Sequence, residues 1–282
     1  MTELINSIYF PASVPRYRHA ALWRCLETYD DAELLPAHGR IKIVRYLIKA
    51  AADRARGKKI IFFSDLHYSG KEKELVLELA GKIKQLSPDL ILCGGDFTAN
   101  AAELKELPEC LEILAGCSPL CITVPGNWER GKEWLDQKFW HSFFAGSRWH
   151  YLCNESMPVE DWGWVYGSDD NSRGNPDVLE LPPEKRQNIL LVHRPDTVVY
   201  LDWERKINDF HLAVCGHTHG GQIRLPFIGA LTAPSFYRTR FTGGVFARND
   251  SDCRMIVSTG VHHASFPWRF NCRREVILLE FQ

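Results

Sequence analysis

Five short segments of the chain carry side chains that bind metal ions or move protons, and each follows an apolar run typical of a strand. They are 64–67 (Ser-Asp-Leu-His), 94–96 (Gly-Gly-Asp), 125–129 (Pro-Gly-Asn-Trp-Glu), 192–195 (Val-His-Arg-Pro) and 215–221 (Cys-Gly-His-Thr-His-Gly-Gly). Ligands collect at the strand ends of α/β sheets because the loops there converge on one crevice. We therefore expect the five segments to meet at a single site.

The candidate ligands in these segments are two carboxylates, one carboxamide and four imidazoles: Asp65, His67, Asp96, Asn127, His193, His217 and His219. Within the Asp-x-His and His-x-His pairs the residues are two apart, so on an extended backbone both would point the same way. The mixed oxygen and nitrogen set suits Mn, Fe, Zn, Co or Ni better than a cysteine-rich structural zinc site. Seven ligands are too many for one tetrahedral ion, but with a bridging carboxylate they suit two ions about 3.5–4 Å apart.

Simpler explanations exist for each segment alone. A single Gly-Gly-Asp or Gly-Asn is usually a turn, and a single buried histidine is more often hydrogen-bonded in a core than bound to a metal. Five such segments, each after an apolar run, favour the metal site. The histidines outside them have no comparable setting, and we interpret them as structural or surface residues: His19, His38, His141, His150 and His211.

The elements that must position these residues alternate between strand and helix in the first half of the chain. The apolar patterns predict strands at 60–64, 90–93 and 120–124, and helices at 71–86 and 101–115, the second interrupted or kinked at Pro108. From about residue 149 the elements are mostly strands: 164–166, 189–192, 212–215, 222–225, 254–258 and 275–281. Residues 41–49 are ambiguous between strand and helix. The pattern predicts an α/β fold of two packed sheets with helices outside.

Composition excludes several classes of protein. With 282 residues, 45% of them hydrophobic, the chain is too long for a small disulfide module and too apolar for wholesale disorder. Its formal charge of -1 gives no overall attraction to nucleic acid. No apolar run approaches the roughly 18 to 20 residues that span a bilayer. The nine cysteines form no Cys-x-x-Cys pair, and with no signal peptide evident we expect reduced cytosolic thiols that pack as small hydrophobic side chains.

The first 57 residues differ from residues 58–282, and we expect them to form a basic, aromatic extension that faces a membrane. Its Lys and Arg residues lie beside Trp and Tyr, and 16–29 has the spacing of an amphipathic helix. A second segment, 225–246, is rich in apolar residues and contains no acid. The alternatives are that the first segment is simply solvated and that the second is a strand pair closing a sheet.

The five segments, in their order, are similar to the motifs of the calcineurin-like metallophosphoesterases. The resemblance covers about residues 58–282 and implies an αββα sandwich of two mixed sheets flanked by helices. Two stretches, 216–226 (Gly-His-Thr-His-Gly-Gly-Gln-Ile-Arg-Leu-Pro) and 271–276 (Asn-Cys-Arg-Arg-Glu-Val), resemble a bacterial membrane-associated phosphodiesterase branch. That branch includes the chlamydial-type UDP-2,3-diacylglucosamine pyrophosphohydrolase of lipid A synthesis.

The resemblance implies two divalent ions, most often manganese, which activate a water for in-line attack on phosphorus. One ion would take Asp65, His67, Asp96 and His219. The other would take Asp96, Asn127, His193 and His217. Asp96 would bridge them, and the catalytic roles would fall on Asp96, Asn127 and His217. For substrate binding we predict Arg130, Arg194, Asn100, Arg238 and Arg240.

One position departs from the family pattern. The usual motif is Gly-Asn-His-Asp/Glu, whose histidine assists the leaving group, whereas this chain has Trp128 there. An alkoxide leaving group, whose conjugate acid has a pKa of about 16, like water, needs a general acid. A phosphate monoester, with a pKa of about 6, does not. Trp128 therefore favours a pyrophosphate bond, unless His262 or His263 supplies the acid or activity is lost.

The resemblance, together with Trp128, implies an enzyme that hydrolyses UDP-2,3-diacylglucosamine to UMP and 2,3-diacylglucosamine 1-phosphate. We expect it on the cytoplasmic face of the inner membrane as a peripheral protein, with no nucleic-acid partner and no obligate protein partner. One alternative is a broad phosphodiesterase or phosphatase that acts on another phospholipid or on a nucleotide. An alternative of another class is a non-catalytic binding protein stabilised by metal.

Overall fold

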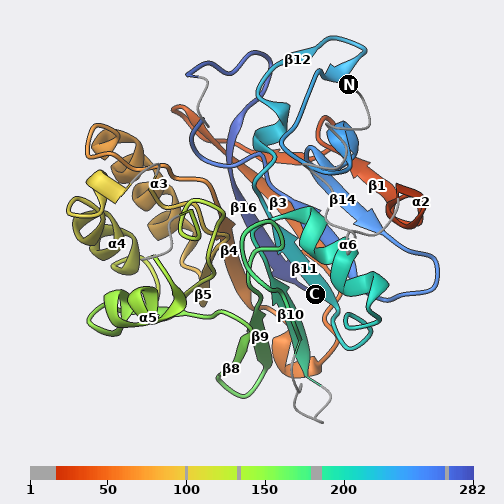
Figure 1. Cartoon of the computed structure of the whole chain (residues 1–282), viewed down its shortest axis with the longest axis horizontal. Coiled ribbons are helices and arrows are strands. Elements are labelled where there is room, and N and C mark those ends of the chain that lie inside the picture. The colour runs from red at the N-terminus through yellow and green to blue at the C-terminus, as the bar shows by residue number, and fades with distance from the viewer. Residues whose placement is uncertain (1–16, 99–100, 132–134, 179–185, 264–266) are drawn as a thin grey trace.

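Two seven-stranded mixed sheets pack face to face in the computed structural model, which describes residues 17–98, 101–131, 135–178, 186–263 and 267–282 (Figure 1). Sheet I runs in the order β1 (Arg24–Thr28), β14 (Gly244–Ala247), β15 (Arg254–Val257), β11 (Leu212–Cys215), β10 (Gln187–Leu191), β9 (Gly163–Gly167) and β8 (Glu155–Val159). Sheet II runs in the order β2 (Glu33–Leu35), β3 (Ile41–Ile48), β16 (Arg274–Phe281), β4 (Lys59–Phe63), β5 (Leu90–Cys93), β6 (Cys121–Thr123) and β7 (Trp149–Tyr151).

The central strands are apolar on both faces because each face is covered. In β4, Ile60 and Phe62 enter the core between the sheets, whereas Ile61 and Phe63 enter the core under the helices. A strand buried on both sides reads as a continuous apolar run, which is why the sequence revealed these strands. The predicted α/β sandwich is confirmed.

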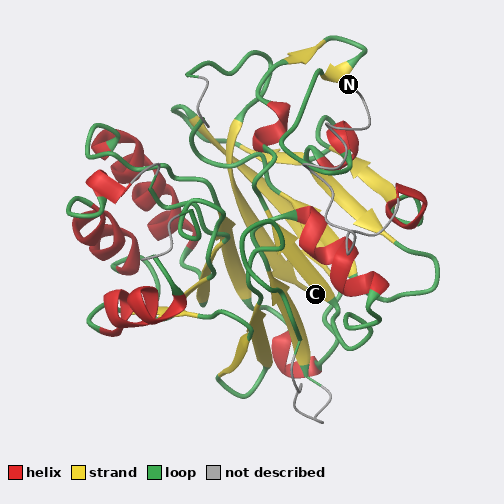
Figure 2. Cartoon of the chain, viewed as in Figure 1, coloured by secondary structure: helices red, strands yellow, loops and turns green. Residues whose placement is uncertain are grey.

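Helices cover the two outer faces (Figure 2). Three of them, α3 (Lys73–Leu86), α4 (Leu107–Ala115) and α5 (Gln137–Ala145), pack on sheet II, and α6 (Pro195–Trp203) packs on sheet I. The helix predicted at 71–86 is confirmed. The one predicted at 101–115 is a 3₁₀ turn, η2 (Ala101–Glu103), followed by α4. Pro108 lies in the first turn of α4 and starts that helix rather than kinking it, because its fixed φ and missing N–H suit the first turn.

The prediction of a helix over 16–29 is wrong. The structure has only the short α2 (Tyr17–Ala20), and β1 then pairs antiparallel with β14. Trp23, part of the apolar spacing, is buried and donates a hydrogen bond from its indole to Asp202, 3.0 Å away. Pairing with a distant strand therefore overrides the local helical pattern.

The boundary after residue 57 does not divide the sheets. The ambiguous stretch 41–49 is the strand β3, which pairs with β16 over eight residue pairs, so the N-terminal segment belongs to the sandwich. Several of its cations are paired with acids: Arg45 contacts Glu33 at 2.7 Å, Arg54 contacts Asp161 at 2.7 Å, and Arg56 contacts Asp53 at 3.1 Å. Its membrane-facing role stays a prediction.

The segment 225–246 is divided among three structures. Its start forms a hairpin of β12 (Arg224–Leu225) and β13 (Gly229–Ala230), apart from both large sheets. A 3₁₀ turn, η4 (Arg238–Phe241), follows, and β14 then joins sheet I. Two of the apolar residues of this segment, Phe241 and Phe246, are buried and cannot face a membrane. The described helices include none with both the length and the apolar character to cross a bilayer.

Candidate metal centre

The carboxyl ends of five neighbouring parallel strands carry the seven predicted ligands. In sheet II the loops after β4, β5 and β6 carry Asp65, His67, Asp96 and Asn127. In sheet I the loops after β10 and β11 carry His193, His217 and His219. Because the two sheets pack together, these loops meet at one edge of the sandwich.

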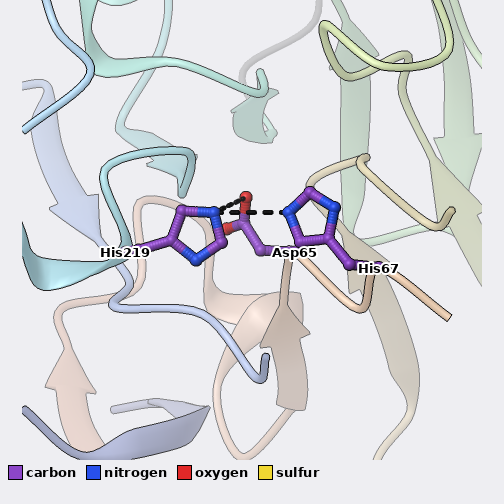
Figure 3. A group of neighbouring side chains, drawn as sticks. All are labelled: Asp65, His67 and His219. Atoms are coloured by element: carbon purple, nitrogen blue, oxygen red, sulfur yellow. Dashed lines mark hydrogen bonds and ion pairs between the residues drawn. The ribbon is translucent and has the colours of Figure 1, made fainter. Parts of the chain in front are cut away.

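The first cluster consists of Asp65, His67 and His219, whose ligand atoms lie within 4.8 Å of one another (Figure 3). His67 Nε2 is 3.3 Å from His219 Nε2, which is 3.4 Å from Asp65 Oδ1. All three side chains are buried. Asp65 Oδ1 has no hydrogen-bond partner among the described residues. A buried carboxylate oxygen without a partner is costly, and a cation would satisfy it.

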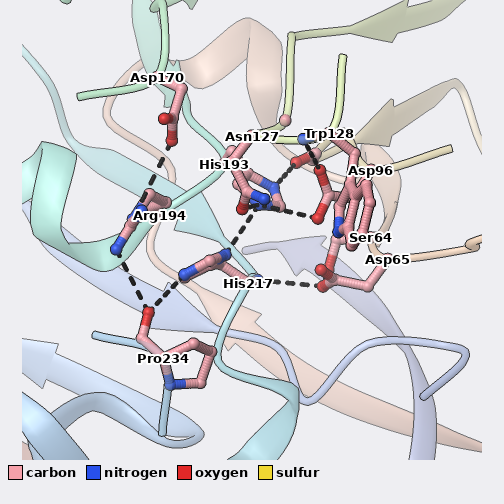
Figure 4. Close-up of polar contacts among 12 residues, drawn as sticks. Ser64, Asp65, Asp96, Asn127, Trp128, Asp170, His193, Arg194, His217 and Pro234 are labelled. Carbon is pink, nitrogen blue, oxygen red and sulfur yellow. Dashed lines mark hydrogen bonds and ion pairs between the residues drawn. The ribbon is translucent and has the colours of Figure 1, made fainter. Parts of the chain in front are cut away.

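The second cluster consists of Asp96, His193 and His217, with Asn127 beside it (Figure 4). His193 Nε2 lies 3.3 Å from Asp96 Oδ2, 3.0 Å from His217 Nδ1 and 3.1 Å from Asn127 Oδ1. Asp96 Oδ2 is also 3.8 Å from His67 Nε2 of the first cluster. This oxygen therefore lies between the clusters, where a bridging ligand is needed.

Backbone carbonyls hold three of the histidines in orientations that suit metal binding. His193 Nδ1 donates to Gly94 O at 2.7 Å, His219 Nδ1 to His262 O at 3.1 Å, and His217 Nε2 to Pro234 O at 2.5 Å. Because a carbonyl only accepts, the other ring nitrogen of each faces the cluster, where it presents a lone pair when the imidazole is neutral. The donor set fits two divalent cations.

The ligand pairs were expected on an extended backbone, but the backbone at most of the ligands is left-handed. Five of them have left-handed φ angles: Asp65 at 60°, His67 at 41°, Asp96 at 54°, His217 at 68° and His219 at 49°. Such a conformation costs on the order of 1–3 kcal/mol per residue and occurs where function requires it. The paired side chains converge through sharp turns after the strands rather than through alternation along a strand.

The four histidines of the clusters differ in the direction in which their pKa is shifted. Burial lowers the pKa of His67 to about 4 and lowers those of His217 and His219 well below the usual value. Burial acts in the same direction on His193, but the Asp96 carboxylate outweighs it and raises the pKa of His193 to about 10. Three imidazoles are therefore ready to bind a cation at neutral pH, and the fourth carries a proton on the nitrogen that would bind it.

We expect binding of divalent ions to tighten by up to about tenfold for each pH unit between about pH 7 and 9, because a cation must displace the His193 proton. The affinity rises with pH since the proton is the competitor and His193 loses it only near its raised pKa. Calorimetric titration with Mn²⁺ in buffers of different ionisation enthalpy would count the released protons. Binding that releases none and ignores pH would contradict the expectation.

Glu129 anchors two of the ligand loops, a role that its place in the third segment did not predict. Its buried carboxylate accepts backbone N–H bonds from Asp96 at 2.7 Å, Phe97 at 2.9 Å and Gly126 at 2.8 Å. Burial, and then the charge of Asp96, raises the pKa of Glu129 to about 7. The available signal was the carboxylate at the end of Pro-Gly-Asn-Trp-Glu.

Glu129→Gln should weaken metal binding about 10- to 100-fold, the usual cost of losing a partner that supports metal ligands. All three of its partners are N–H donors, and the amide NH₂ of glutamine would face one of them. Metal affinity from calorimetry would measure the effect. The matched control is Glu112→Gln on the exposed surface of α4, where we expect no change. Equal affinities for both variants would show that Glu129 does not position the ligands.

A family model described as calcineurin-like phosphoesterase matches residues 58–221, more than half of the chain. The chain belongs to this family. It is a metal-dependent phosphoester hydrolase with a candidate dinuclear site. The match to the family model begins at residue 58, so it does not include β1, β2 and β3.

Two curated relatives of this phosphoesterase cover most of its length. It is 28% identical to "Phosphodiesterase YaeI" of Escherichia coli (strain K12), over 86% of this chain and 88% of the relative. It is 28% identical to "Uncharacterized metallophosphoesterase YkuE" of Bacillus subtilis (strain 168), over 78% and 77%. Among solved structures, a dimetal phosphatase from Danio rerio is 9% identical, with a TM-score of 0.47 over 73% of this chain and 88% of that one.

Three of the four predicted substrate-binding arginines of this phosphoesterase have partners within the chain. Arg130 pairs with Asp169 at 3.1 Å. Arg194 donates to Pro234 O at 3.2 Å, the carbonyl that also accepts from His217 (Figure 4), so it supports a metal ligand. Arg240 donates to Ala20 O at 2.9 Å and fixes the N-terminal segment. Arg238 is exposed, and Asn100 lies outside the described residues. Their contacts with substrate stay predictions.

Trp128 lies at the edge of the metal centre. Its backbone N–H donates to Asp96 Oδ1 at 2.9 Å, and its ring, 38% exposed, meets the His67 ring edge-on at 6.0 Å between centroids. His262 is buried, and burial followed by the charges of His263 and Arg274 lowers the pKa of His262 to about 3. His262 is therefore neutral at physiological pH and poorly suited to donate a proton to a leaving group.

Proposed function

We propose that the substrate is UDP-2,3-diacylglucosamine and that the enzyme cleaves its pyrophosphate to UMP and 2,3-diacylglucosamine 1-phosphate, a step of lipid A synthesis. The observation that carries this proposal is Trp128, which stands beside the metal clusters where the family has a histidine. A leaving group that is a phosphate monoester departs without a general acid, because its pKa is about 6.

In the proposed reaction the oxygen of water bonds to phosphorus, and the bond from phosphorus to the bridging oxygen of the pyrophosphate breaks. Two divalent ions, when bound, supply positive charge for the phosphoryl oxygens and lower the pKa of water. Asp96 Oδ2 lies 3.3 Å from His193 Nε2 and 3.8 Å from His67 Nε2, so it faces both clusters. Trp128 contributes an apolar wall beside His67 and donates no side-chain proton to the departing oxygen.

The second candidate is a phosphodiesterase that acts on another phospholipid or on a nucleotide. The name of the Escherichia coli relative, "Phosphodiesterase YaeI", favours it at 28% identity. For a lipid substrate we propose a peripheral protein at the cytoplasmic face of the inner membrane, since an acylated substrate resides in a bilayer. Manganese is our proposed metal because the donor set combines carboxylates and imidazoles.

The test is to incubate the Mn²⁺-loaded protein with UDP-2,3-diacylglucosamine, with its deacylated counterpart and with bis(p-nitrophenyl) phosphate. We expect UMP and the acylated sugar 1-phosphate, identified by mass spectrometry, at a kcat/KM well above that for the deacylated compound. Cleavage of the aryl diester without cleavage of either UDP-sugar would favour the second candidate. Cleavage of none of the three would contradict the proposed function.

A further inference from the structure

An exposed apolar surface lies at the β12–β13 hairpin and the segment that pairs with it. We call it the hairpin surface, and its residues are Phe227, Ile228, Leu231, Trp268 and Phe270. All five side chains are more than half exposed, and Phe227 and Ile228 at the hairpin tip reach 110% and 71%. Large exposed apolar groups gathered in one place mark sites of interaction.

Backbone hydrogen bonds join the two segments into one surface. Arg224 N donates to Phe270 O at 3.0 Å, and Phe270 N donates to Gln222 O at 2.9 Å. Leu231 N donates to Ile223 O at 3.1 Å, which closes the hairpin beside the same strand. The hairpin projects at the top of Figure 1, away from α3, α4 and α5. The apolar side chains are thus held by a regular hydrogen-bonded framework.

The backbone at the hairpin tip argues that Phe227 has a role outside the folded chain. Its φ is +65°, a left-handed conformation that is an outlier for a bulky residue and that glycine or asparagine adopts at lower cost. Because Phe227 is fully exposed, packing within the described chain does not offset that cost. Contact with an apolar environment beyond the protein would offset it.

The two chain stretches that carry the hairpin surface contain cations and no acid. The sequence has no Asp or Glu in 210–249 or in 253–274, the stretches that include both segments, whereas both contain arginines. Arg269 lies between Trp268 and Phe270 in the chain and is partly exposed, and Arg238, eleven residues after Phe227, is exposed. Apolar tips beside cations suit a bilayer of anionic lipids, whose headgroups attract the arginines while the acyl region takes the apolar side chains.

The hairpin surface is also continuous with the metal centre. The 3₁₀ turn η3 (His219–Gly221) carries a ligand of the first cluster and leads within two residues to Ile223 of the hairpin framework. Arg269, between Trp268 and Phe270, donates to His262 O, which accepts from His219 Nδ1 at 3.1 Å. A bilayer bound at the hairpin would therefore lie beside the first cluster.

We propose that the hairpin surface docks the protein on an anionic lipid bilayer, with Phe227 and Ile228 inserted and the first metal cluster beside the headgroups. The inference rests on the proposed function for its purpose, since a lipid-linked substrate would be drawn from that bilayer. It revises the predicted membrane surface: Trp23 and Tyr29 of the N-terminal segment are buried, and Trp268 and Phe270 replace them. Docking itself requires no turnover.

The experiment is co-sedimentation of the full-length, Mn²⁺-loaded protein with vesicles of phosphatidylcholine, with and without one quarter phosphatidylglycerol. We expect binding to the anionic vesicles that weakens with salt, and at least a tenfold lower partition coefficient for the double variant Phe227→Asp and Ile228→Asp. The control is Leu77→Asp, an exposed apolar position on α3 (50% exposed) that lies away from the hairpin. This variant should bind vesicles as the wild type does. Melting temperature and metal content of both variants should match the wild type.

Three outcomes would overturn the docking proposal. The wild type does not bind either vesicle, or Leu77→Asp loses binding as the double variant does, or the double variant binds fully. The wild type could instead fail to bind vesicles and form dimers in solution that the double variant does not form. That result would assign the surface to a second copy of the chain. Release of UMP from UDP-2,3-diacylglucosamine dispersed in detergent needs no vesicle, so failure of docking and failure of the proposed function are distinguishable.

Discussion

Replacing Asp96 by alanine should abolish phosphoester hydrolysis and leave fewer than two tightly bound divalent ions per chain. Asp96 Oδ2 is 3.3 Å from His193 Nε2 and 3.8 Å from His67 Nε2, so its loss removes the only carboxylate oxygen shared by the two described clusters. We expect kcat to fall at least about 10³-fold, equivalent to about 4 kcal/mol of transition-state stabilisation. Mass-spectrometric metal counts and hydrolysis of bis(p-nitrophenyl) phosphate would measure both effects.

A second variant separates loss of the bridge from damage to the fold. Asp96 Oδ1 accepts the Trp128 backbone N–H at 2.9 Å, and Asp96→Asn can keep that hydrogen bond through its amide oxygen while it removes the charge. We expect Asp96→Asn to be inactive with a near-native melting temperature. Asn127→Ala should weaken chiefly the second site, because its Oδ1 contacts His193. The exposed Asp30→Ala is the control. Full activity with one ion per chain at saturation would refute the dinuclear site.

Replacing Trp128 by histidine should accelerate cleavage of diesters with alkoxide leaving groups by about 10²-fold, the lower range of general acid catalysis. The same change should have little effect on a pyrophosphate, whose leaving group has a pKa of about 6 and needs no proton. The position is suitable because the Trp128 ring already contacts His67 at the edge of the first cluster. Rates for methyl p-nitrophenyl phosphate, alkyl diesters and a UDP-sugar would give the comparison.

Two variants keep this comparison sharp. Trp128→Phe retains an aromatic ring beside His67 without a titratable group, so it should not accelerate any diester. Trp203→His places a histidine at a comparably exposed tryptophan on α6, 46% exposed against 38%, and should leave both substrate classes unchanged. If Trp128→His changed diester and pyrophosphate rates by the same factor, the leaving-group explanation of Trp128 would fail.

Much of the candidate site could be predicted from the sequence because its ligands follow apolar strands that are buried on both faces. The apolar runs that end before Asp65, Asp96 and His217 are short, continuous and bounded by glycine or serine. The sequence therefore predicts both the ends of these strands and the ligands that follow them. The sequence could not show the left-handed turns at these residues, since side-chain type does not specify that φ for Asp or His. Nor could it assign Glu129, whose partners include backbone N–H groups of another loop, at Asp96 and Phe97.

The sequence by itself determined which residue types end the strands, and therefore the family, the chemistry and the two-sheet class of fold. Tertiary structure alone decided what the N-terminal segment and the arginines do. β3 pairs with β16, which lies more than two hundred residues later in the chain. Arg54 forms an ion pair with Asp161, and Lys59 forms one with Glu280. Local periodicity reports whether a side chain is buried, but a partner distant in the chain is fixed only when the sheets close. For that reason the sequence could single out 225–246 as an apolar segment, but only the structure shows which of its side chains, such as Phe227, are exposed and that Trp268 is exposed as well.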